Sequence, residues 1–253
     1  MRRRFFVDSF DENSANLRGD AAEHLGRVLR AERGQFYELS DGHQVWLGRV
    51  ERIAISRRGD SHIEFALVEP IPVCEPSLTI DLLISIIKFD RFEWCLEKAT
   101  ELGVTEIVPL AAARTDKLLL AAAEKRHTRW ERILLESSQQ SRRLRPPVVR
   151  SAARPGDAFA QCAAASKLLL SERREAPKLR SVLNGGLPHS SAKTTAHAPA
   201  VALAIGPEGG WTDDEFYEAC TGGFNEVSLG GNILRTETAV VASLAIVCFA
   251  LDA

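Results

Sequence analysis

The stretch that decides the fold is residues 205–216, "IGPEGGWTDDEF". A run of apolar, partly β-branched residues, Val201 to Ile205, enters it, and a helix-like segment leaves it. Three glycines and one proline within five residues remove side chains and fix the turns of the backbone. A buried strand that ends on such a turn indicates that something lies close against its peptide groups.

A second turn of the same kind follows Leu229, with the sequence "GGNILRTET". In open parallel sheets, ligands bind at the carboxyl ends of the strands, where the loops carry specificity. One glycine-rich turn favours an ordinary strand-to-helix connection, but two in one sheet favour a ligand site. Neither turn matches the dinucleotide pattern GxGxxG or the phosphate-binding pattern GxxxxGK[ST], which are both absent.

Acidic residues follow the first turn, where a helix is expected to begin with Thr212, Asp213, Asp214 and Glu215. This much negative charge would repel a phosphate from the helix N-terminus, where phosphates usually bind. A cationic or neutral ligand fits better, and an adenosyl sulfonium has the required character. The alternative role of the three acids is ordinary capping and complementarity to the helix dipole.

Strands and helices alternate after residue 76, which predicts an α/β domain with a parallel sheet over residues 76–253. The helix over 90–102 is expected to have Asp90 as its N-cap and to end at Gly103. Residues 173–200 are expected to form a partly disordered surface loop. The predicted strands are 77–88, 104–110, 166–172, 200–205 and 226–229, and further helices are predicted at 124–142, after Thr212 and from Thr236.

Residues 1–70 show short, roughly alternating apolar runs, which predict a small β-barrel. One helix from Asp20 to Arg30 is expected to interrupt the strands. The proline-rich stretch "EPIPVCEPS", residues 69–77, is interpreted as the linker between the two domains.

The composition is that of a soluble globular protein, with 253 residues, 45% hydrophobic and 26% charged. The opening "MRRRFFVDSF" lacks the apolar stretch of a signal peptide, and the most apolar run, 238–251, is too short to span a bilayer. Five scattered cysteines without a CxxC motif indicate reduced thiols and no zinc site. We therefore expect a cytoplasmic protein without a metal or a membrane anchor.

Charge is unevenly distributed although the net charge is only −2. Residues 114–154 hold eleven basic and four acidic side chains, a net charge of +7, whereas residues 201–253 hold one basic residue, Arg235, against eight acidic ones. A cationic block of this size suggests a polyanion partner. A solvated helix face is the alternative interpretation.

Several motifs together resemble one family. "IGPEGGWTDDE" followed by "LGGNILRTETA" resembles the SPOUT-type RNA methyltransferases that methylate N3 of a uridine in 16S ribosomal RNA (uridine 1498 type; the RsmE family). The segments "AEHLGRVLR", "LSDG", "KFDRFEWCLEKATELGVTEIVPL" and "SSQQSRRLRPP" are similar to further parts of that family in the same order. The chain differs at Gln139 and Arg142, where the family often has glutamate and glycine, and in a longer segment at 173–200.

The resemblance implies a trefoil-knotted SPOUT domain over 76–253 and a PUA-like, RNA-binding β-barrel over 1–70. It also implies a homodimer that acts on the 30S ribosomal subunit. S-adenosylmethionine would lie between three loops, 170–172, 205–210 and 229–236. The implied cofactor-binding residues are Leu170, Ser171, Ile205, Gly206, Pro207, Glu208, Gly209, Gly210, Leu229, Gly230, Ile233, Leu234 and Thr236.

Methylation at uridine N3 requires loss of the imide proton, which leaves negative charge on O2, N3 and O4. The site therefore needs a cation or hydrogen-bond donors aimed at that charge. Arg235 is the predicted cation, with a salt bridge to Glu237 or Glu208 as its alternative role. Glu208 and Glu237 are the candidate proton acceptors or orienting carboxylates, and Trp211 is interpreted as either a base-stacking or a core residue.

Ribosomal RNA would be held by arginines that contact phosphates and give affinity without sequence choice. The candidates are Arg27 and Arg30 on one face of the first helix, and Arg142, Arg143 and Arg145 before a proline pair. Two other functions remain as alternatives: an RNA-binding ribosome-assembly factor without catalysis, and a nucleotide-linked metabolic enzyme. The missing phosphate motifs and the N-terminal barrel argue against the metabolic enzyme.

Overall fold

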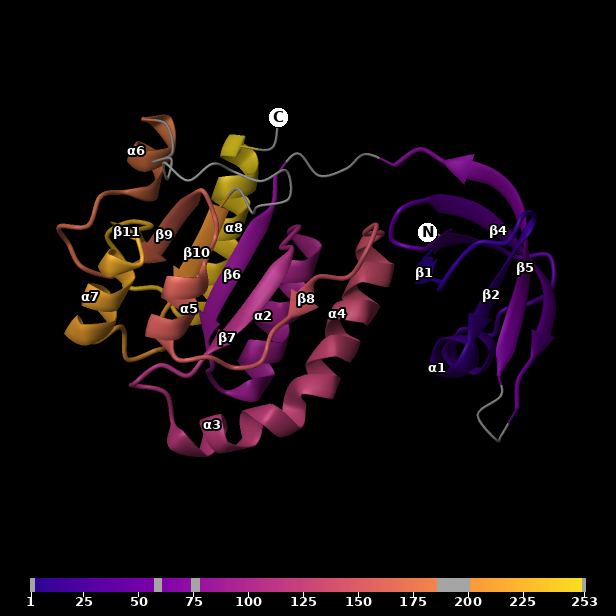
Figure 1. Cartoon of the computed structure of the whole chain (residues 1–253), viewed down its shortest axis with the longest axis horizontal. Helices are drawn as coiled ribbons and strands as arrows, with labels where there is room; N and C mark the ends of the chain where they lie inside the picture. Colours follow the sequence, from indigo (N-terminus) through magenta and orange to yellow (C-terminus); the bar gives the residue numbers. More distant parts are fainter. Residues whose placement is uncertain (1–2, 57–60, 74–77, 186–200, 252–253) are drawn as a thin grey trace. The chain divides into compact units, whose positions relative to one another are not determined.

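The computed structural model describes residues 3–56, 61–73, 78–185 and 201–251. The chain divides into two compact units, which are drawn in the colours of the sequence in Figure 1. Unit 1 comprises Met1–Glu75 together with Leu135–Pro146, and unit 2 comprises Pro76–Leu134 and Pro147–Ala253.

Unit 1 is built on a five-stranded sheet in the order β1-β3-β4-β5-β2. Only the β1–β3 pair is parallel, and β4 and β5 show two register shifts that bend the sheet. Alternating side chains such as Leu39, Val50, Ile63 and Phe65 are fully buried and form the core of this unit. The strands are β1 (Arg4–Phe6), β2 (Ser14–Arg18), β3 (Phe36–Ser40), β4 (Val45–Ala54) and β5 (His62–Ile71).

The helix of unit 1 is shorter than the sequence pattern predicts. Helix α1 (Gly19–Glu23) passes into a π-helical segment, His24–Val28, which the Leu29 amide closes by donating to the His24 carbonyl. The chain then turns away, and Arg30 has a φ of 52°. The prediction of one regular helix to Arg30 was therefore wrong, because the wide turn places Leu25 in the core and ends the regular repeat.

Two further expectations for unit 1 need correction. Strand β5 continues to Ile71, so the first residues of the proline-rich stretch belong to the sheet; residues 74–77 lie outside the described part. Strand β2 was not predicted, because its five residues "SANLR" bury only Ala15 and Leu17 and give a weak alternation.

Unit 2 contains a six-stranded sheet in the order β11-β9-β10-β6-β7-β8, and every pairing is parallel. The central strands β6 and β10 are buried along their whole length, as expected for strands covered on both faces. The strands are β6 (Ile80–Ser85), β7 (Glu106–Leu110), β8 (Val148–Val149), β9 (Ser166–Leu170), β10 (Val201–Ile205) and β11 (Asn225–Val227).

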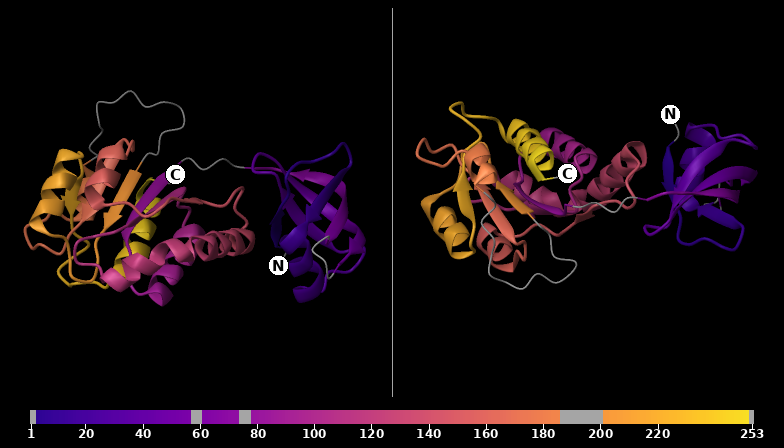
Figure 2. Two further views of the ribbon diagram at one scale, coloured as in Figure 1. Left: turned by 60° about the horizontal axis from the view of Figure 1, so that its bottom comes forward. Right: turned by 90° about the horizontal axis from the view of Figure 1, so that it is seen from above.

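Helices cover both faces of this sheet (Figure 2). One face packs against α2, α4, α6 and α8 through residues such as Leu82, Leu203 and Leu244; the other packs against α5 and α7 through Leu83, Ala204 and Phe159. The helices are α2 (Phe89–Glu101), α3 (Lys117–Ala123), α4 (His127–Ser141), α5 (Pro155–Gln161), α6 (Leu179–Asn184), α7 (Asp213–Thr221) and α8 (Thr236–Leu251), with a 3-10 turn at Glu124–Arg126. The part of α4 from Leu135 onward belongs to unit 1.

The ends of α2 show one correct and one wrong prediction. Gly103 follows the helix with a φ of 91°, a conformation that glycine adopts without strain. The N-cap is Lys88 and not Asp90, which lies in the first turn, where its charge complements the helix dipole. The chain enters the helix directly from the strand end, so Asp90 is already helical.

Three helices, α3, α5 and α6, were not predicted. They are short, and α6 lies within the stretch 173–200 that was expected to be a loop. Residues 186–200 of that stretch lie outside the described part. Among the described residues, no helix has the length and apolar character needed to cross a membrane.

Candidate functional site

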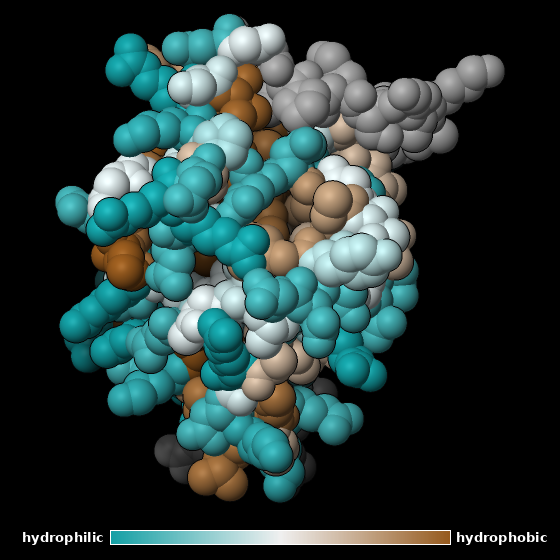
Figure 3. Space-filling view, turned by 90° about the vertical axis from the view of Figure 1, so that its left-hand side faces the viewer, coloured by the Kyte–Doolittle hydropathy of each residue, from teal (hydrophilic) through white to brown (hydrophobic). Residues whose placement is uncertain are grey.

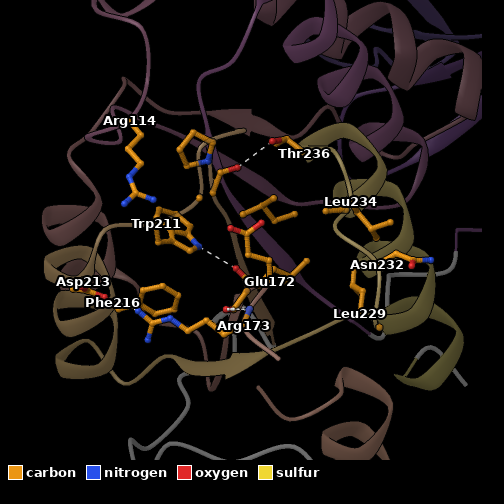
Figure 4. A pocket seen from close by; sticks show the side chains of 18 residues that line it. Arg114, Glu172, Arg173, Trp211, Asp213, Phe216, Leu229, Asn232, Leu234 and Thr236 are labelled. Carbon is orange, nitrogen blue, oxygen red and sulfur yellow. Dashed lines mark hydrogen bonds and ion pairs between the residues drawn. The ribbon is translucent and has the colours of Figure 1, made fainter. Parts of the chain in front are cut away.

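A pocket of about 320 Å³ lies at the carboxyl ends of β9 and β10 and beside the segment that follows β11. Figure 4 shows Trp211, Phe216, Arg173 and Arg114 on one side of it, and Leu229, Asn232, Leu234 and Thr236 on the other. Glu172 lies between the two sides. The two glycine turns of the sequence therefore meet at one site, as the topology of a parallel sheet predicts.

The glycines after β10 leave no room for a side chain. A Cβ on Gly206 would lie 3.0 Å from Cε2 of Trp211, and a Cβ on Gly210 would lie 3.0 Å from Oε1 of Glu172. Gly210 also has a φ of 72°, which side chains disfavour. A side chain at either position would therefore have to displace Trp211 or Glu172.

Neighbouring segments hold this loop through its carbonyl groups. The Thr236 hydroxyl donates to the Gly206 carbonyl at 3.1 Å, and Nη1 of Arg114 donates to the Gly209 carbonyl at 2.7 Å. Thr236 begins α8, and Arg114 follows β7. The loop is thus fixed by the ends of two other elements, which preorganises the pocket.

Trp211 has a structural role at the base of the loop. Its side chain is buried, its Nε1 donates to the Leu170 carbonyl at 3.0 Å, and its ring packs edge-to-face on Phe159. Because its only polar group is used inside the protein, the core alternative for this tryptophan is the one that the structure favours.

Charged side chains form one wall of the pocket. Nη2 of Arg173 donates to Oδ1 of Asp213 at 2.7 Å, and its guanidinium lies 3.6 Å from the centre of the Phe216 ring. The Arg173 amide also donates to the Ser171 hydroxyl at 3.0 Å. Arg114 and Glu172 complete this wall, so the pocket is polar and holds both signs of charge.

Helix α7 begins with a complete capping box, as predicted for Thr212 and Glu215. Glu215 is buried and also accepts a hydrogen bond from the Ala113 amide at 2.8 Å, so it joins α7 to the loop after β7. Asp213 and Asp214 are exposed. The face of unit 2 that carries α7 is mostly hydrophilic in Figure 3. The capping box and the hydrogen bond from Ala113 show that Glu215 has a capping role in the structure.

Ten of the thirteen predicted cofactor-binding residues line the pocket. The other three, Glu208, Gly209 and Ile233, lie in the same loops outside its lining. Arg114 was missed, although it follows the carboxyl end of β7 and the rule applied to the other strands would have found it. The ten residues are Leu170, Ser171, Ile205, Gly206, Pro207, Gly210, Leu229, Gly230, Leu234 and Thr236.

Arg91 is a residue of the site that sequence reasoning did not find. Its guanidinium donates from Nη1 to Oε1 of Glu208, and its Nε lies 3.8 Å from Oε1 of Glu237. The second oxygen of Glu237, Oε2, is buried and has no hydrogen-bond partner among the described residues. Arg91 lies in the first turn of α2, just beyond the carboxyl end of β6, so its position in the sequence was the available signal.

Arg235 lies between Leu234 and Thr236, which line the pocket, but its own side chain is exposed and does not line it. Among the described residues, neither Glu208 nor Glu237 forms an ion pair with Arg235, since both face Arg91. The alternative role proposed for Arg235, a salt bridge to one of these carboxylates, is therefore absent from this part of the chain.

The predicted RNA-binding arginines lie in unit 1 with different surroundings. Arg27 pairs with Glu23 and Arg30 is exposed beyond the helix, so they do not share one helix face as expected. Arg142 lies 3.5 Å from Glu38, and burial together with Arg145 lowers the pKa of Arg143 to about 10. Arg145 is exposed.

Arg142 has a φ of 57°, the left-handed conformation that glycine adopts without strain. This matches the glycine that the related family often has at this position. The cationic block is also partly neutralised, because Arg126 and Arg129 pair with Glu93 and Arg150 pairs with Glu106.

Among the described residues, no three His, Cys, Asp or Glu side chains are grouped so that they could hold a metal ion. The pocket therefore has to be understood from its backbone groups, its apolar walls and its charged side chains.

Comparison with known proteins places these features in a family. Residues 74–248 match the model of the RNA methyltransferase domain. The ribosomal RNA small subunit methyltransferase E of Synechocystis is 34% identical over 92% of this chain and 72% of its own, and that of Rickettsia conorii is 29% identical over 96% and 93%.

Solved structures agree with this result. The methyltransferase E of Neisseria gonorrhoeae, bound to S-adenosyl methionine, has a TM-score of 0.81 at 30% identity and covers 98% of both chains. A putative methyltransferase of Legionella pneumophila, in complex with the same cofactor, has a TM-score of 0.80 at 28% identity and covers 99% of this chain and 98% of its own. The chain is thus a member of the ribosomal RNA small subunit methyltransferase E family.

Proposed function

We propose that this protein transfers the methyl group of S-adenosylmethionine to N3 of a uridine in the 16S RNA of the small ribosomal subunit. The observation that carries the proposal is the pocket in which the two glycine turns, the end of β9 and the start of α8 meet. Two relatives of the same fold are described with this cofactor bound. The uridine of the 1498 type is the target that the family resemblance supports.

The residues present fit this cofactor. Gly206 and Gly210 line the pocket without side chains, and Leu170, Leu229 and Leu234 offer an apolar surface to a flat ring. Glu172 places negative charge in the pocket, whereas the charge of Asp213 is balanced by Arg173. When bound, S-adenosylmethionine supplies an electrophilic methyl group. The protein's part is to hold it and to exclude water from the reacting atoms.

Arg235 is assigned the role of stabilising the uridine anion. The lining residues on either side of it, Leu234 and Thr236, hold its backbone at the rim of the pocket, and its exposed side chain is open to a base that approaches from solvent. A guanidinium there stabilises the charge that develops on the uracil oxygens when the N3 proton leaves. The two carboxylates that could have formed a salt bridge with Arg235, Glu208 and Glu237, face Arg91 instead, which supports this assignment.

Glu208 and Glu237 are assigned an orienting role together with Arg91. The three side chains connect the loop after β10, the start of α8 and the start of α2. They therefore fix the loop that presents Gly206 and the helix that follows Arg235. Glu237, with its unpartnered buried oxygen, is the better candidate of the two for accepting the uridine proton.

RNA binding is assigned to unit 1, which would correspond to the PUA-like barrel at residues 1–70. Of the five predicted RNA-binding arginines, Arg27, Arg30 and Arg145 are exposed, whereas Arg142 and Arg143 are half-buried. We expect Arg30→Glu and Arg145→Glu to reduce affinity for 16S RNA and to weaken its salt dependence.

A homodimer and a trefoil knot complete the proposal. Unit 2 exposes large apolar side chains on the adjacent helices α2 and α8, with Trp94 at 43% and Phe249 at 93% exposure. Exposed apolar side chains on neighbouring helices are suited to a symmetric contact with a second copy. The convergence of three loops from β9, β10 and β11 on one pocket is compatible with the knot. A ribosomal substrate supports a location in the cytoplasm.

The deciding experiment uses 30S subunits that lack the modification and S-adenosylmethionine labelled in its methyl group. Incorporation of label into a single N3-methyluridine is expected, with Arg235→Ala losing turnover and keeping cofactor affinity. If the protein bound S-adenosylmethionine but transferred no label to any RNA, the function that remains would be an RNA-binding assembly factor without catalysis. Absence of cofactor binding would overturn the proposal.

A further inference from the structure

A second cleft lies in unit 2. The first pocket is at the carboxyl ends of the strands, whereas this cleft is near the amino ends of β6 and β7. It has a volume of about 660 Å³ and is bounded by the segment after β8 and by α5. None of its lining residues lines the first pocket. Its lining is mixed: Leu83, Val108 and four alanines give an apolar surface, whereas Asp81, Glu106, Arg150, Ser151 and Gln161 are polar or charged.

Asp81 lies at this cleft and is 8% exposed. Its Oδ1 is shielded from solvent and has no hydrogen-bond partner among the described residues. A buried carboxylate oxygen without a donor is unfavourable by a few kcal/mol, and native proteins seldom keep one without a function. Asp81 is thus a nearly buried acid at the wall of the cleft, and the exposed remainder of its carboxyl is the part that a ligand could reach.

The charged neighbours of Asp81 that the structure describes do not supply a donor to its Oδ1. Nη2 of Arg150, the nearest cation, donates to Oε2 of Glu106 at 2.7 Å. Burial and the charge of Glu106 raise the pKa of Asp81 to about 7, while Arg150 lowers it. Lys167 of β9 donates to the Gly222 carbonyl, and burial raises the pKa of the Cys162 thiol at the cleft.

We propose that this cleft binds an aliphatic ammonium group, with the ammonium on Asp81 and its alkyl chain along the alanine and valine walls. An ammonium supplies compact donors and a charge that balances the carboxylate. A divalent cation fits less well, because no metal-holding group of side chains occurs among the described residues. This inference does not depend on methyl transfer, since the cleft shares no residue with the first pocket.

Two sources of an aliphatic ammonium are distinguished by the probe. 1,4-Diaminobutane represents a free polyamine, and Nα-acetyl-lysine amide represents a lysine side chain of a partner protein. Calorimetric titration of the full-length protein with each probe at pH 6 and pH 8 is the measurement. The probe that binds more tightly identifies the source.

Binding is expected to be about tenfold tighter at pH 8 than at pH 6, because a carboxyl with a pKa of about 7 is mostly ionised only at the higher pH. Asp81→Asn should abolish binding while the circular dichroism spectrum is unchanged. Asp214→Asn, an exposed acid on α7, is the matched control and should bind like the wild type.

Three results would overturn the proposal. They are an Asp81→Asn variant that binds as well as the wild type, binding that is tighter at pH 6, and no binding of either probe by the wild type at millimolar concentration. Tighter binding at pH 6 would mean that the protonated carboxyl takes a neutral ligand instead.

Discussion

Gly206 lines the pocket and packs against the buried ring of Trp211. Its carbonyl accepts from Thr236, while the space that its Cβ would need is taken by three atoms of the Trp211 ring at 3.0 to 3.2 Å. Trp211 is itself fixed by its hydrogen bond to Leu170. The position is therefore closed to any side chain that does not displace either the ring or the loop.

Gly206→Ala is the first prediction at this scale. Overpacking of this kind costs about 1–3 kcal/mol, which corresponds to a loss of roughly 5- to 150-fold in affinity if it falls on the pocket. We expect weaker S-adenosylmethionine binding in a calorimetric titration. Gly231→Ala is the control, because nothing lies within 4 Å of a Cβ there. Equal effects of the two variants would contradict the assigned role of Gly206.

Arg91 carries the second prediction. Arg91→Ala leaves Glu208 and Glu237 without their common partner, so the loop after β10 and the start of α8 lose their connection. We expect at least a tenfold loss of kcat in single-turnover methylation, with a smaller change in cofactor affinity because Arg91 does not line the pocket. Arg91→Lys should recover part of the loss, since lysine keeps the charge without the guanidinium geometry.

The matched control for Arg91 is Arg126→Ala. Arg126 forms an ion pair with Glu93, which lies on α2, the helix that carries Arg91. The side chain of Arg126 is 41% exposed. Such a surface pair contributes little, about 0–1 kcal/mol. If both variants lost turnover equally, the effect would come from general destabilisation and not from the carboxylates at the site.

At the scale of elements, α7 shows how one helix start serves two purposes. Thr212 and Glu215 satisfy the free amides of the first turn, and Glu215 also accepts from the Ala113 amide. The helix is thereby attached to the loop that carries Arg114, the donor to the Gly209 carbonyl. Capping and pocket geometry are thus coupled through one buried carboxylate.

Glu215→Ala is predicted to destabilise the protein more than Thr212→Ala. Loss of a threonine N-cap costs about 1 kcal/mol. Loss of Glu215 costs more, because it also leaves the Ala113 amide without its acceptor. Urea unfolding followed by circular dichroism measures both, and Asp214→Ala should have the smallest effect of the three. An order with Thr212→Ala as the most destabilising variant would contradict this account.

At the scale of the whole molecule, Asp81 links stability to pH. Its pKa is about 7 in the folded protein against an ordinary value of 3.8, so between these values the folded state binds more protons than the unfolded state. Stability contributed by the protonated form is therefore lost as the pH rises from 4 through 7. Ionisation of Asp81 therefore strengthens the proposed binding of an ammonium group and lowers the stability of the folded protein.

Asp81→Asn should remove this dependence. We expect the variant to be more stable than the wild type at pH 8, by an amount on the order of a few kcal/mol, with the difference shrinking towards pH 4. Urea titrations at intervals of one pH unit measure it. Curves for the two proteins that stay parallel over this range would show that the carboxyl at position 81 titrates normally.

The sequence by itself determined the class of the fold and the place where a pocket forms. The run Val201 to Ile205 is a fully buried strand as predicted, and the two glycine turns meet at one pocket. Both results depend on local properties. Apolar runs mark strands covered on two faces, and parallel strands bring their carboxyl ends to one edge of a sheet.

Only the tertiary structure decided which side chains meet. The pairing of Arg91 with Glu208 and Glu237 joins residues more than one hundred positions apart, and the π-helical turn after Glu23 depends on how Leu25 packs in the core. The unpartnered, buried oxygen of Asp81 likewise depends on its place in the folded sheet and not on its neighbours in the sequence. Contacts of this kind are set by packing between elements, which periodicity and motif spacing do not encode.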